Sequence, residues 1–186
     1  MLEQDVAKNS LDSIACLGNI PELLTIDASH NRLTSASLPT KRFLQRLSLA
    51  GNRIEELGAV AHPQLESLVL DDNKISNVAG LTAAQLPSLT TLSLRGNRLT
   101  STASIAALPT LTHLTVASNQ LQALDGLAAL VALTHLDLHS NQLQTLGAFA
   151  PLLALRSLDL RCTSPPFLPP LPPQNPGARS ENIKPR

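Results

Sequence analysis

Leucine and isoleucine recur along the chain at fixed distances from a repeated asparagine. In residues 88–101 the alternation of Leu92 with Leu94 predicts a short β-strand that ends close to Asn97. Asparagines in the same frame occur at 31, 52, 73, 97, 119 and 141, so the intervals are 21, 21, 24, 22 and 22 residues. A strand this short is not stable alone, so the repetition predicts that each strand pairs with the strands of neighbouring repeats.

Four apolar places accompany each asparagine. With the asparagine as position nine, positions one, four, six and eleven hold leucine, isoleucine or valine, and only Ala28 is undersized. This pattern, L-x-x-L-x-L-x-x-N-x-L at a period in the twenties, is the signature of leucine-rich repeats, which stack into a curved solenoid. A further strand begins around Leu158, but Thr163 takes the asparagine place and the frame ends there. Upstream, residues 9–20 are interpreted as the back half of an imperfect first repeat.

The segments between the strands predict the other side of the solenoid. Apolar residues recur there about every third position, as at Leu121, Leu124 and Leu127, which favours short helical or 3₁₀ turns on the convex side. The predicted fold class is therefore α/β: a leucine-rich repeat solenoid with a parallel concave sheet. Its repeat of about 22 residues resembles the short-repeat subclass of the phosphatase regulator SDS-twenty-two. We expect about seven repeats in residues 1–163.

Residues 164–186 have a different composition. Eight of the 14 prolines lie between Thr163 and Arg186, and the apolar period is lost. A disordered or extended tail is the favoured interpretation. The alternative is that "LPPLPP" forms a polyproline II segment that docks into an aromatic groove, but a flanking Arg or Lys, which usually orients such ligands, is missing.

Composition and charge exclude several classes of function. The 186 residues are 43% hydrophobic and 2% aromatic, as thin leucine coils require, and 14 basic residues balance 14 acidic ones. No basic field attracts nucleic acid or an anionic membrane, and the polar start of the chain lacks an apolar signal core, so we expect a soluble cytoplasmic protein. Cys16 and Cys162 should lie about 30 Å apart at opposite ends of the solenoid, too far for a disulfide.

The side chains fall into a buried set and an exposed set. An asparagine amide both donates and accepts, so the repeated asparagine can satisfy backbone groups where the chain leaves each strand. We expect a structural ladder of Asn31, Asn52, Asn73, Asn97, Asn119 and Asn141. Positions three, five and seven should face outward on the concave side, where the candidate partner-binding residues are Arg46, Asp71, Arg95, His113, His135, Asp137, His139 and Asp159.

The histidines and aspartates of that face raise two other possibilities. A zinc site would need ligand bonds of about 2 Å, which an open sheet face rarely allows, so solvated polar residues on a binding face are the favoured interpretation and no metal or cofactor is predicted. An enzyme is not predicted, because the sequence contains neither a nucleophile on a sharp turn nor a Gly-rich phosphate loop.

The irregular features of the array resemble one family more closely. The words "AHPQLESLVLDDNKISNVAGLTAAQLPSLTTLSLRGNRLTSTASIAALPTLTHL" and "LHSNQLQTLGAFAPLLALRSLDLR", with the His62-Pro63 pair and the 24-residue interval before Asn97, are similar to leucine-rich repeat proteins of ciliary and flagellar radial spokes. The likeness covers residues 15–161. The chain lacks that family's acidic amino-terminal extension, and the proline-rich ending replaces a further repeat and its cap, which suggests a truncated or variant form.

The resemblance implies a structural role in the axoneme, needed for motility, with other radial-spoke components as partners. The alternative is a cytosolic regulatory adaptor, like the phosphatase-binding relatives of the repeat subclass. The last leucine strand is followed directly by Thr-Ser-Pro-Pro, so we also expect self-association through an uncapped C-terminal edge.

Overall fold

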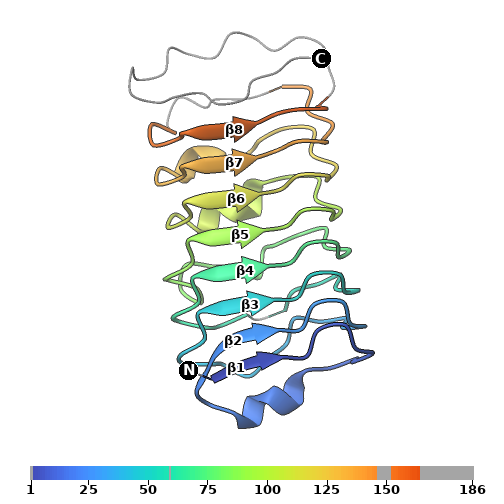
Figure 1. The fold of residues 1–186 in the computed structure, drawn as a ribbon. Helices are drawn as coiled ribbons and strands as arrows, with labels where there is room; N and C mark the ends of the chain where they lie inside the picture. Colours follow the sequence, from blue (N-terminus) through green and yellow to red (C-terminus); the bar gives the residue numbers. More distant parts are fainter. Residues whose placement is uncertain (1, 59, 146–151, 164–186) are drawn as a thin grey trace.

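Eight short strands form one parallel sheet in the computed structural model, which describes residues 2–58, 60–145 and 152–163. The order of the strands in the sheet is their order in the chain, so each coil of the solenoid adds one strand beside the last (Figure 1). The predicted leucine-rich repeat solenoid is confirmed. The strands are β1 (Leu2–Asp5), β2 (Leu23–Asp27), β3 (Arg46–Ser48), β4 (Ser67–Val69), β5 (Thr91–Ser93), β6 (His113–Thr115), β7 (His135–Asp137) and β8 (Ser157–Asp159).

Residues at equivalent positions of successive repeats lie opposite one another in neighbouring strands. Leu92 of β5 is in register with Leu68 of β4 and Leu114 of β6, although the repeat before β5 is longer than the others. The extra residues are therefore absorbed on the convex side, and the leucines of successive strands stack into one continuous core with almost no solvent exposure.

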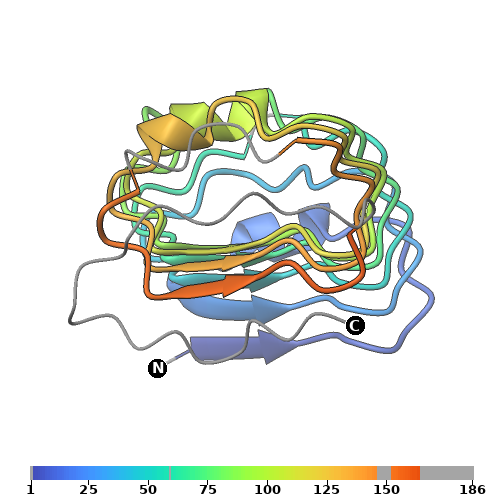
Figure 2. The same cartoon turned by 90° about the horizontal axis from the view of Figure 1, so that it is seen from above.

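The convex side is less helical than the spacing predicts. Among the described residues, 3₁₀ helices form only at η1 (Ala15–Asn19), η2 (Ala103–Ala107) and η3 (Leu127–Ala129). Seen from above, η2 and η3 lie opposite the sheet (Figure 2). The other described convex segments are irregular turns that still bury their apolar residues, such as Val60 and Val78. None of these helices is long or apolar enough to span a membrane.

The first repeat has a strand of its own, which the pattern did not predict. β1 pairs with β2, and Gln4 is opposite Ile26 at the place that should hold leucine. The register shifts between Leu2 and Glu3. The leucine pattern did not reveal this strand because Gln4 occupies a position that is apolar in the other repeats. The strand forms nevertheless, because the backbone of β2 offers hydrogen-bond partners along its parallel edge.

The residue before each repeated asparagine has a left-handed backbone. Positive φ angles between 52° and 66° occur at position eight of the coils, at Lys8, His30, Gly51, Asp72, Gly96, Ser118, Ser140 and Cys162. This conformation turns the chain sharply off the strand and directs the next side chain into the coil. Two of the eight positions carry glycine, the residue that adopts the conformation most readily.

The turn continues one coil beyond the asparagine frame. Cys162 has φ 55°, and the Thr163 hydroxyl donates to the Leu160 carbonyl at 2.7 Å. Asn141 makes the equivalent bond to Leu138 at 2.8 Å, so Thr163 takes over one of the contacts of the repeated asparagine at this turn. The proline-rich tail and any cover that it gives to the outer edge of β8 lie outside the described residues, and the domain boundary at 163 stays a prediction.

Candidate functional site

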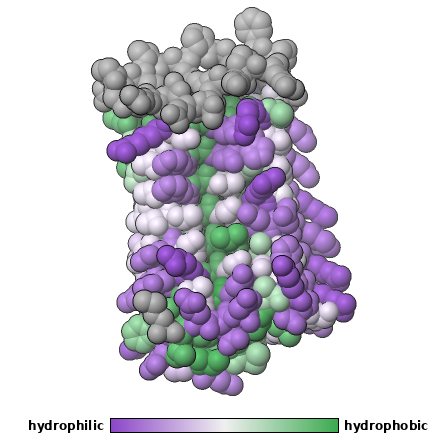
Figure 3. Space-filling model, viewed as in Figure 1, coloured by the Kyte–Doolittle hydropathy of each residue, from purple (hydrophilic) through white to green (hydrophobic). Residues whose placement is uncertain are grey.

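The outward-facing side chains of the strands form a polar surface, the concave face. The strands lie toward the viewer in Figure 1, and the same view in Figure 3 shows hydrophilic side chains on both sides of a narrow hydrophobic streak. Parallel registration sets matching places side by side, so His113 adjoins His135, and Asp137 adjoins Asp159. Five of the predicted residues therefore lie close together on β6 to β8 and the turn after β7. They are His113, His135, Asp137, His139 and Asp159. Arg46 lies on β3, toward the N-terminal end of the sheet.

Asp71 and Arg95 form a separate contact in the middle of the face. The Asp71 carboxylate accepts hydrogen bonds from the Ser93 hydroxyl at 2.6 Å and from the Arg95 backbone N–H at 2.9 Å. The carboxylate therefore ties the turn after β4 to the next coil, and the backbone rather than the guanidinium of Arg95 makes this bond. Asp71 thus has a structural contact in addition to its place on the exposed face.

His113 and His135 stack on one another. Their ring centroids are 4.3 Å apart and their planes differ by 7°. Each Nδ1 contacts the hydroxyl of the preceding threonine, Thr112 at 2.9 Å and Thr134 at 2.8 Å. Burial lowers the pKa of His113, and the neighbouring His135 lowers it further, which favours the neutral ring.

The threonine contacts determine the tautomer of both rings. Each hydroxyl donates its single hydrogen to a carbonyl of the preceding coil, Thr112 to Thr90 at 3.1 Å and Thr134 to Thr112 at 2.9 Å. The hydroxyl oxygen is therefore the acceptor toward the histidine, so Nδ1 carries the proton. In the neutral form each Nε2 is then left with a lone pair for an external donor.

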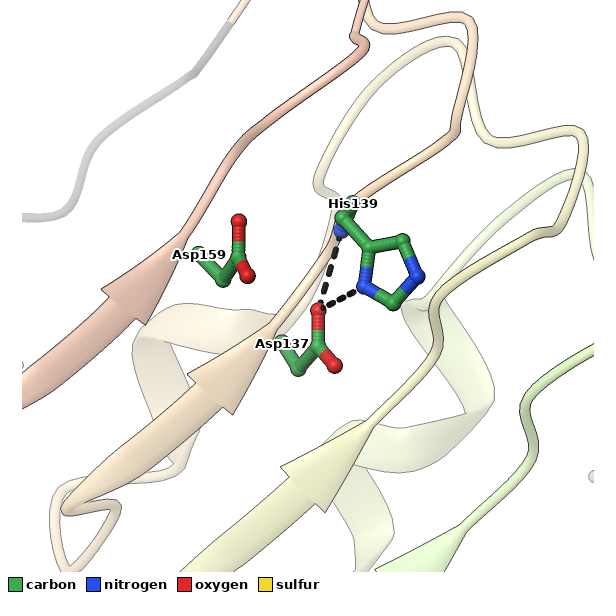
Figure 4. A group of neighbouring side chains, drawn as sticks. All are labelled: Asp137, His139 and Asp159. Carbon is green, nitrogen blue, oxygen red and sulfur yellow. Dashed lines mark hydrogen bonds and ion pairs between the residues drawn. The ribbon is translucent and has the colours of Figure 1, made fainter. Parts of the chain in front are cut away.

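Two side-chain pairs follow the stack toward β8, Asp137 with His139 and Asp159 with Arg161, and Figure 4 shows the first pair beside Asp159. Asp137 Oδ1 accepts from the His139 ring Nδ1 at 2.7 Å and from its backbone N–H at 3.1 Å. Arg161 donates to both carboxylate oxygens of Asp159, at distances between 2.6 and 3.0 Å. These hydrogen bonds from Arg161 hold the pKa of Asp159 below its usual value.

The same residues are the metal-ligand candidate of the face. Asp137, His139 and Asp159 each offer one ligand atom, and the three atoms lie within 4.8 Å of one another. However, the Arg161 guanidinium already neutralises Asp159, and the pair of His139 with Asp137 uses the ring nitrogen that lies nearest the carboxylate. A cation would have to displace these partners, so we retain the prediction that the cluster is part of a protein-binding face.

The repeated asparagines have the contacts of internal turn residues. Asn97 donates from Nδ2 to the Leu94 carbonyl of its own coil at 3.0 Å and to the Leu70 carbonyl of the preceding coil at 2.9 Å. Its Oδ1 accepts the Ile75 backbone N–H at 3.0 Å. The six asparagines are 5–7% exposed and each accepts a backbone N–H of the preceding coil in the same way: Asn31, Asn52, Asn73, Asn97, Asn119 and Asn141.

A buried polar pair, Lys41 and His62, was missed by sequence reasoning. Lys41 is 2% exposed, and its ammonium group donates to the carbonyls of Leu17 at 2.6 Å, Gly18 at 3.0 Å and Ile20 at 2.5 Å. Its backbone N–H donates to His62 Nδ1 at 3.0 Å. The signal was present, because both residues stand three places before position one, where other repeats have Ile20, Leu86, Leu108, Leu130 and Leu152.

The environment of this pair disfavours charge on both groups. Burial lowers the pKa of Lys41, and the three carbonyls compensate the ammonium that remains. Burial and then the Lys41 charge lower the pKa of His62 to about 4, so this ring is neutral at physiological pH. The pair lies inside the first coils and away from the concave face, so we assign it to stability.

Comparison with known proteins points to the same architecture. Residues 63–121 and 109–163 match the family described as "Leucine rich repeat", and residues 40–61 match a second family with the same description. The first two segments together span more than half of the 186 residues.

Curated relatives carry a more specific name. "Leucine-rich repeat-containing protein 23" of Bos taurus is 42% identical over 92 residues, and the Homo sapiens protein of that name is 40% identical over 92 residues. Each alignment covers 50% of this chain and 27% of the relative, so the chain matches about a quarter of the length of these relatives.

Solved structures share the fold. YopM from Yersinia enterocolitica superposes with a TM-score of 0.73 at 26% identity, over 92% of this chain and 35% of that one. An internalin C2 from Listeria monocytogenes reaches 0.70 at 23% identity, over 88% of this chain and 73% of its own, a likeness that concerns the fold alone.

Proposed function

The chain belongs to the leucine-rich repeat family, and on that premise we propose that it is a structural scaffold protein of ciliary or flagellar radial spokes, where it binds other spoke components and supports motility. That a leucine-rich repeat solenoid of this kind binds proteins is the general part of this proposal. The part specific to cilia rests on the relatives named leucine-rich repeat-containing protein 23 and on the radial-spoke family that the irregular repeats resemble.

The concave face has the character that such a scaffold needs. Its side chains project from short strands held by a continuous leucine core, so a partner meets a surface that is already ordered. Arg46, Arg95 and the five residues from His113 to Asp159 supply polar and charged contacts along this face. The open arc and the paired charges are typical of a non-enzymatic scaffold.

The proposal places the protein in the cytoplasm, on the cytoskeleton of a cilium or flagellum. The test is to express the tagged chain in ciliated cells and to extract the cells with detergent. Signal that stays along the axoneme, and is lost when radial spokes are absent, supports the proposal. Diffuse signal that detergent removes would contradict it and would favour the cytosolic adaptor of the phosphatase-regulator type.

A further inference from the structure

The stacked histidines present two parallel hydrogen-bond acceptors at the surface. Both Nδ1 atoms contact threonine hydroxyls, so the two Nε2 lone pairs belong to rings whose centroids are 4.3 Å apart and whose planes are nearly parallel. Among the described residues neither Nε2 has a hydrogen-bond partner, and both side chains are exposed. The two Nε2 atoms are therefore a pair of neighbouring hydrogen-bond acceptors that are open to a donor from another molecule.

Parallel lone pairs select the kind of donor. A metal ion needs lone pairs that converge on one point, whereas those of two stacked rings run side by side. A lysine ammonium has N–H bonds that diverge from one nitrogen. An arginine guanidinium presents two N–H bonds side by side in one plane, which is the arrangement that two parallel acceptors can receive together.

We propose that His113 and His135 form the seat for an arginine side chain on an extended segment of the protein partner. This inference rests on the proposed protein-binding function and names the partner chemistry for one part of the concave face. The guanidinium donates one N–H to each Nε2, and the carboxylate of Asp137, on the strand that carries His135, supplies negative charge beside it.

The charged groups near the seat balance one another, so the acceptor geometry and not the net charge favours arginine. Asp137 lies on β7 and Asp159 on β8, with His139 and Arg161 in the turns that follow them, while Arg95 follows β5 and Arg156 precedes β8 beside Thr134. Neutral histidines accept from a cation, but protonated rings would place like charge against it. Binding of the arginine is therefore expected at neutral pH and is lost when the two rings are protonated.

The experiment has a tautomer readout and a binding readout. Nitrogen-15 NMR of the full chain should show protonated Nδ1 and bare Nε2 at both histidines at about pH 7.5. The probe is an extended peptide, Arg-Ser-Arg-Ser-Arg, compared with Lys-Ser-Lys-Ser-Lys. We expect the arginine peptide to shift both Nε2 signals and to bind about tenfold or more tightly than the lysine peptide. Acidification that protonates both rings should abolish the difference.

The matched variant is the double substitution His113→Phe and His135→Phe, which keeps two flat rings and removes both acceptors. We expect it to lose the preference for arginine and its pH dependence, while His30→Gln, at a turn outside the stack, retains both. An unchanged preference in the double phenylalanine variant, or protonated Nε2 atoms in the native chain, overturns the inference. Failure of the axonemal localisation with intact arginine binding would instead contradict the proposed function and leave the arginine seat standing.

Discussion

At the scale of single residues, the asparagine amides and the left-handed backbone positions fix the turns of each coil, whereas the leucines fill the core between them. Each repeated asparagine links its own coil to the preceding one, because Nδ2 donates to carbonyls of both coils and Oδ1 accepts an N–H from the earlier one. The bonds lie where the chain leaves the strand, among groups that no strand partner reaches. The asparagine side chain therefore supplies the hydrogen-bond partners that these backbone groups would have in regular secondary structure.

The first prediction concerns the amide of Asn97. Asn97→Ala should lower the free energy of unfolding by about 1–3 kcal/mol, because it leaves buried backbone carbonyls and the Ile75 N–H without partners. Urea denaturation measures the change, and Gln120→Ala, at an exposed place one residue beyond Asn119, is the control with little expected effect. Equal stability of Asn97→Ala and the native chain would contradict the structural role.

The second prediction concerns the left-handed turn. Ser118 has φ 53°, and a residue with a Cβ atom is strained there by about 1–2 kcal/mol. Ser118→Gly should therefore raise the free energy of unfolding by about 0.5–1 kcal/mol, after the larger conformational entropy of glycine in the unfolded chain is subtracted. Gly96→Ala, at the same place of another coil with φ 66°, should act in the opposite direction. Thermal melting of both variants checks the pair of signs.

The third prediction concerns the buried His62. Its pKa falls from 6.5 in the unfolded chain to about 4 in the fold. Between these values the unfolded state binds the extra proton, so the free energy of unfolding should decrease as the pH falls, by up to about 3 kcal/mol in total. Asp159, whose pKa lies below its ordinary value, affects stability only at more acidic pH.

Denaturation at several pH values between 6.5 and about 4 measures this decrease. His62→Leu, which restores the leucine found in other repeats, should flatten the pH dependence whatever its stability at neutral pH. A native chain whose stability is constant across this range would show that His62 is not buried in solution.

At the scale of elements, the first coils are joined by one side chain. Lys41 reaches across from the third coil to the end of η1 and donates to three carbonyls there, two of them inside the helix. A leucine at this place would bury apolar area but would leave these carbonyls unpaired. The lysine therefore holds η1 against the solenoid.

The fourth prediction follows from this contact. Lys41→Met should lower the free energy of unfolding by about 2–4 kcal/mol, because it keeps the length of the side chain but removes every donor. Hydrogen exchange should show the loss first in residues 15–20, while amides of β5 to β7 keep their protection. The exposed neighbour Arg42 provides the control, and Arg42→Met should change neither quantity. Uniform loss of protection along the whole array would contradict a local role.

At the scale of the whole molecule, the solenoid places side chains from successive repeats side by side on one exposed face. Residues some 20 apart in sequence become lateral neighbours, so Arg46 and Arg95 stand on the same face as the histidine stack although they lie on different coils. The apolar core lies on the opposite side of the strands from the outer face, so substitutions of outward-facing side chains leave the packing of the leucines untouched.

The fifth prediction uses this separation of face and core. Arg46→Glu together with Arg95→Glu should weaken partner capture about tenfold and leave the melting temperature close to that of the native chain. The matched control is Arg53→Glu with Arg98→Glu, which makes the same charge change at position ten of two coils. Quantitative pull-down from axonemal extract compares the two double variants. Equal capture by both would move the binding surface to the convex side or to an edge of the sheet.

The sequence by itself determined the repeat, its core and its register. The leucines and asparagines at fixed positions of each repeat specify these features locally. Side chains alternate across a strand, and every coil packs against its neighbours in the same way. The rows that place His113 beside His135 and Asp137 beside Asp159 could be read from the spacing alone. What the pattern could not supply was any feature that departs from the repeat, such as β1, with Gln4 in a core place, or the irregular convex turns.

The tertiary structure alone decided which polar groups meet and in what chemical state. Whether Lys41 could be buried depended on carbonyls of η1, more than 20 residues away. The tautomer of the stacked histidines depended on threonine hydroxyls already committed to the preceding coil. The pairing of Asp159 with Arg161 depended on side-chain conformers. Hydrogen bonds are short and directional, so atomic positions select their partners, whereas hydrophobic burial is non-directional and needs only the right kind of residue at the right place.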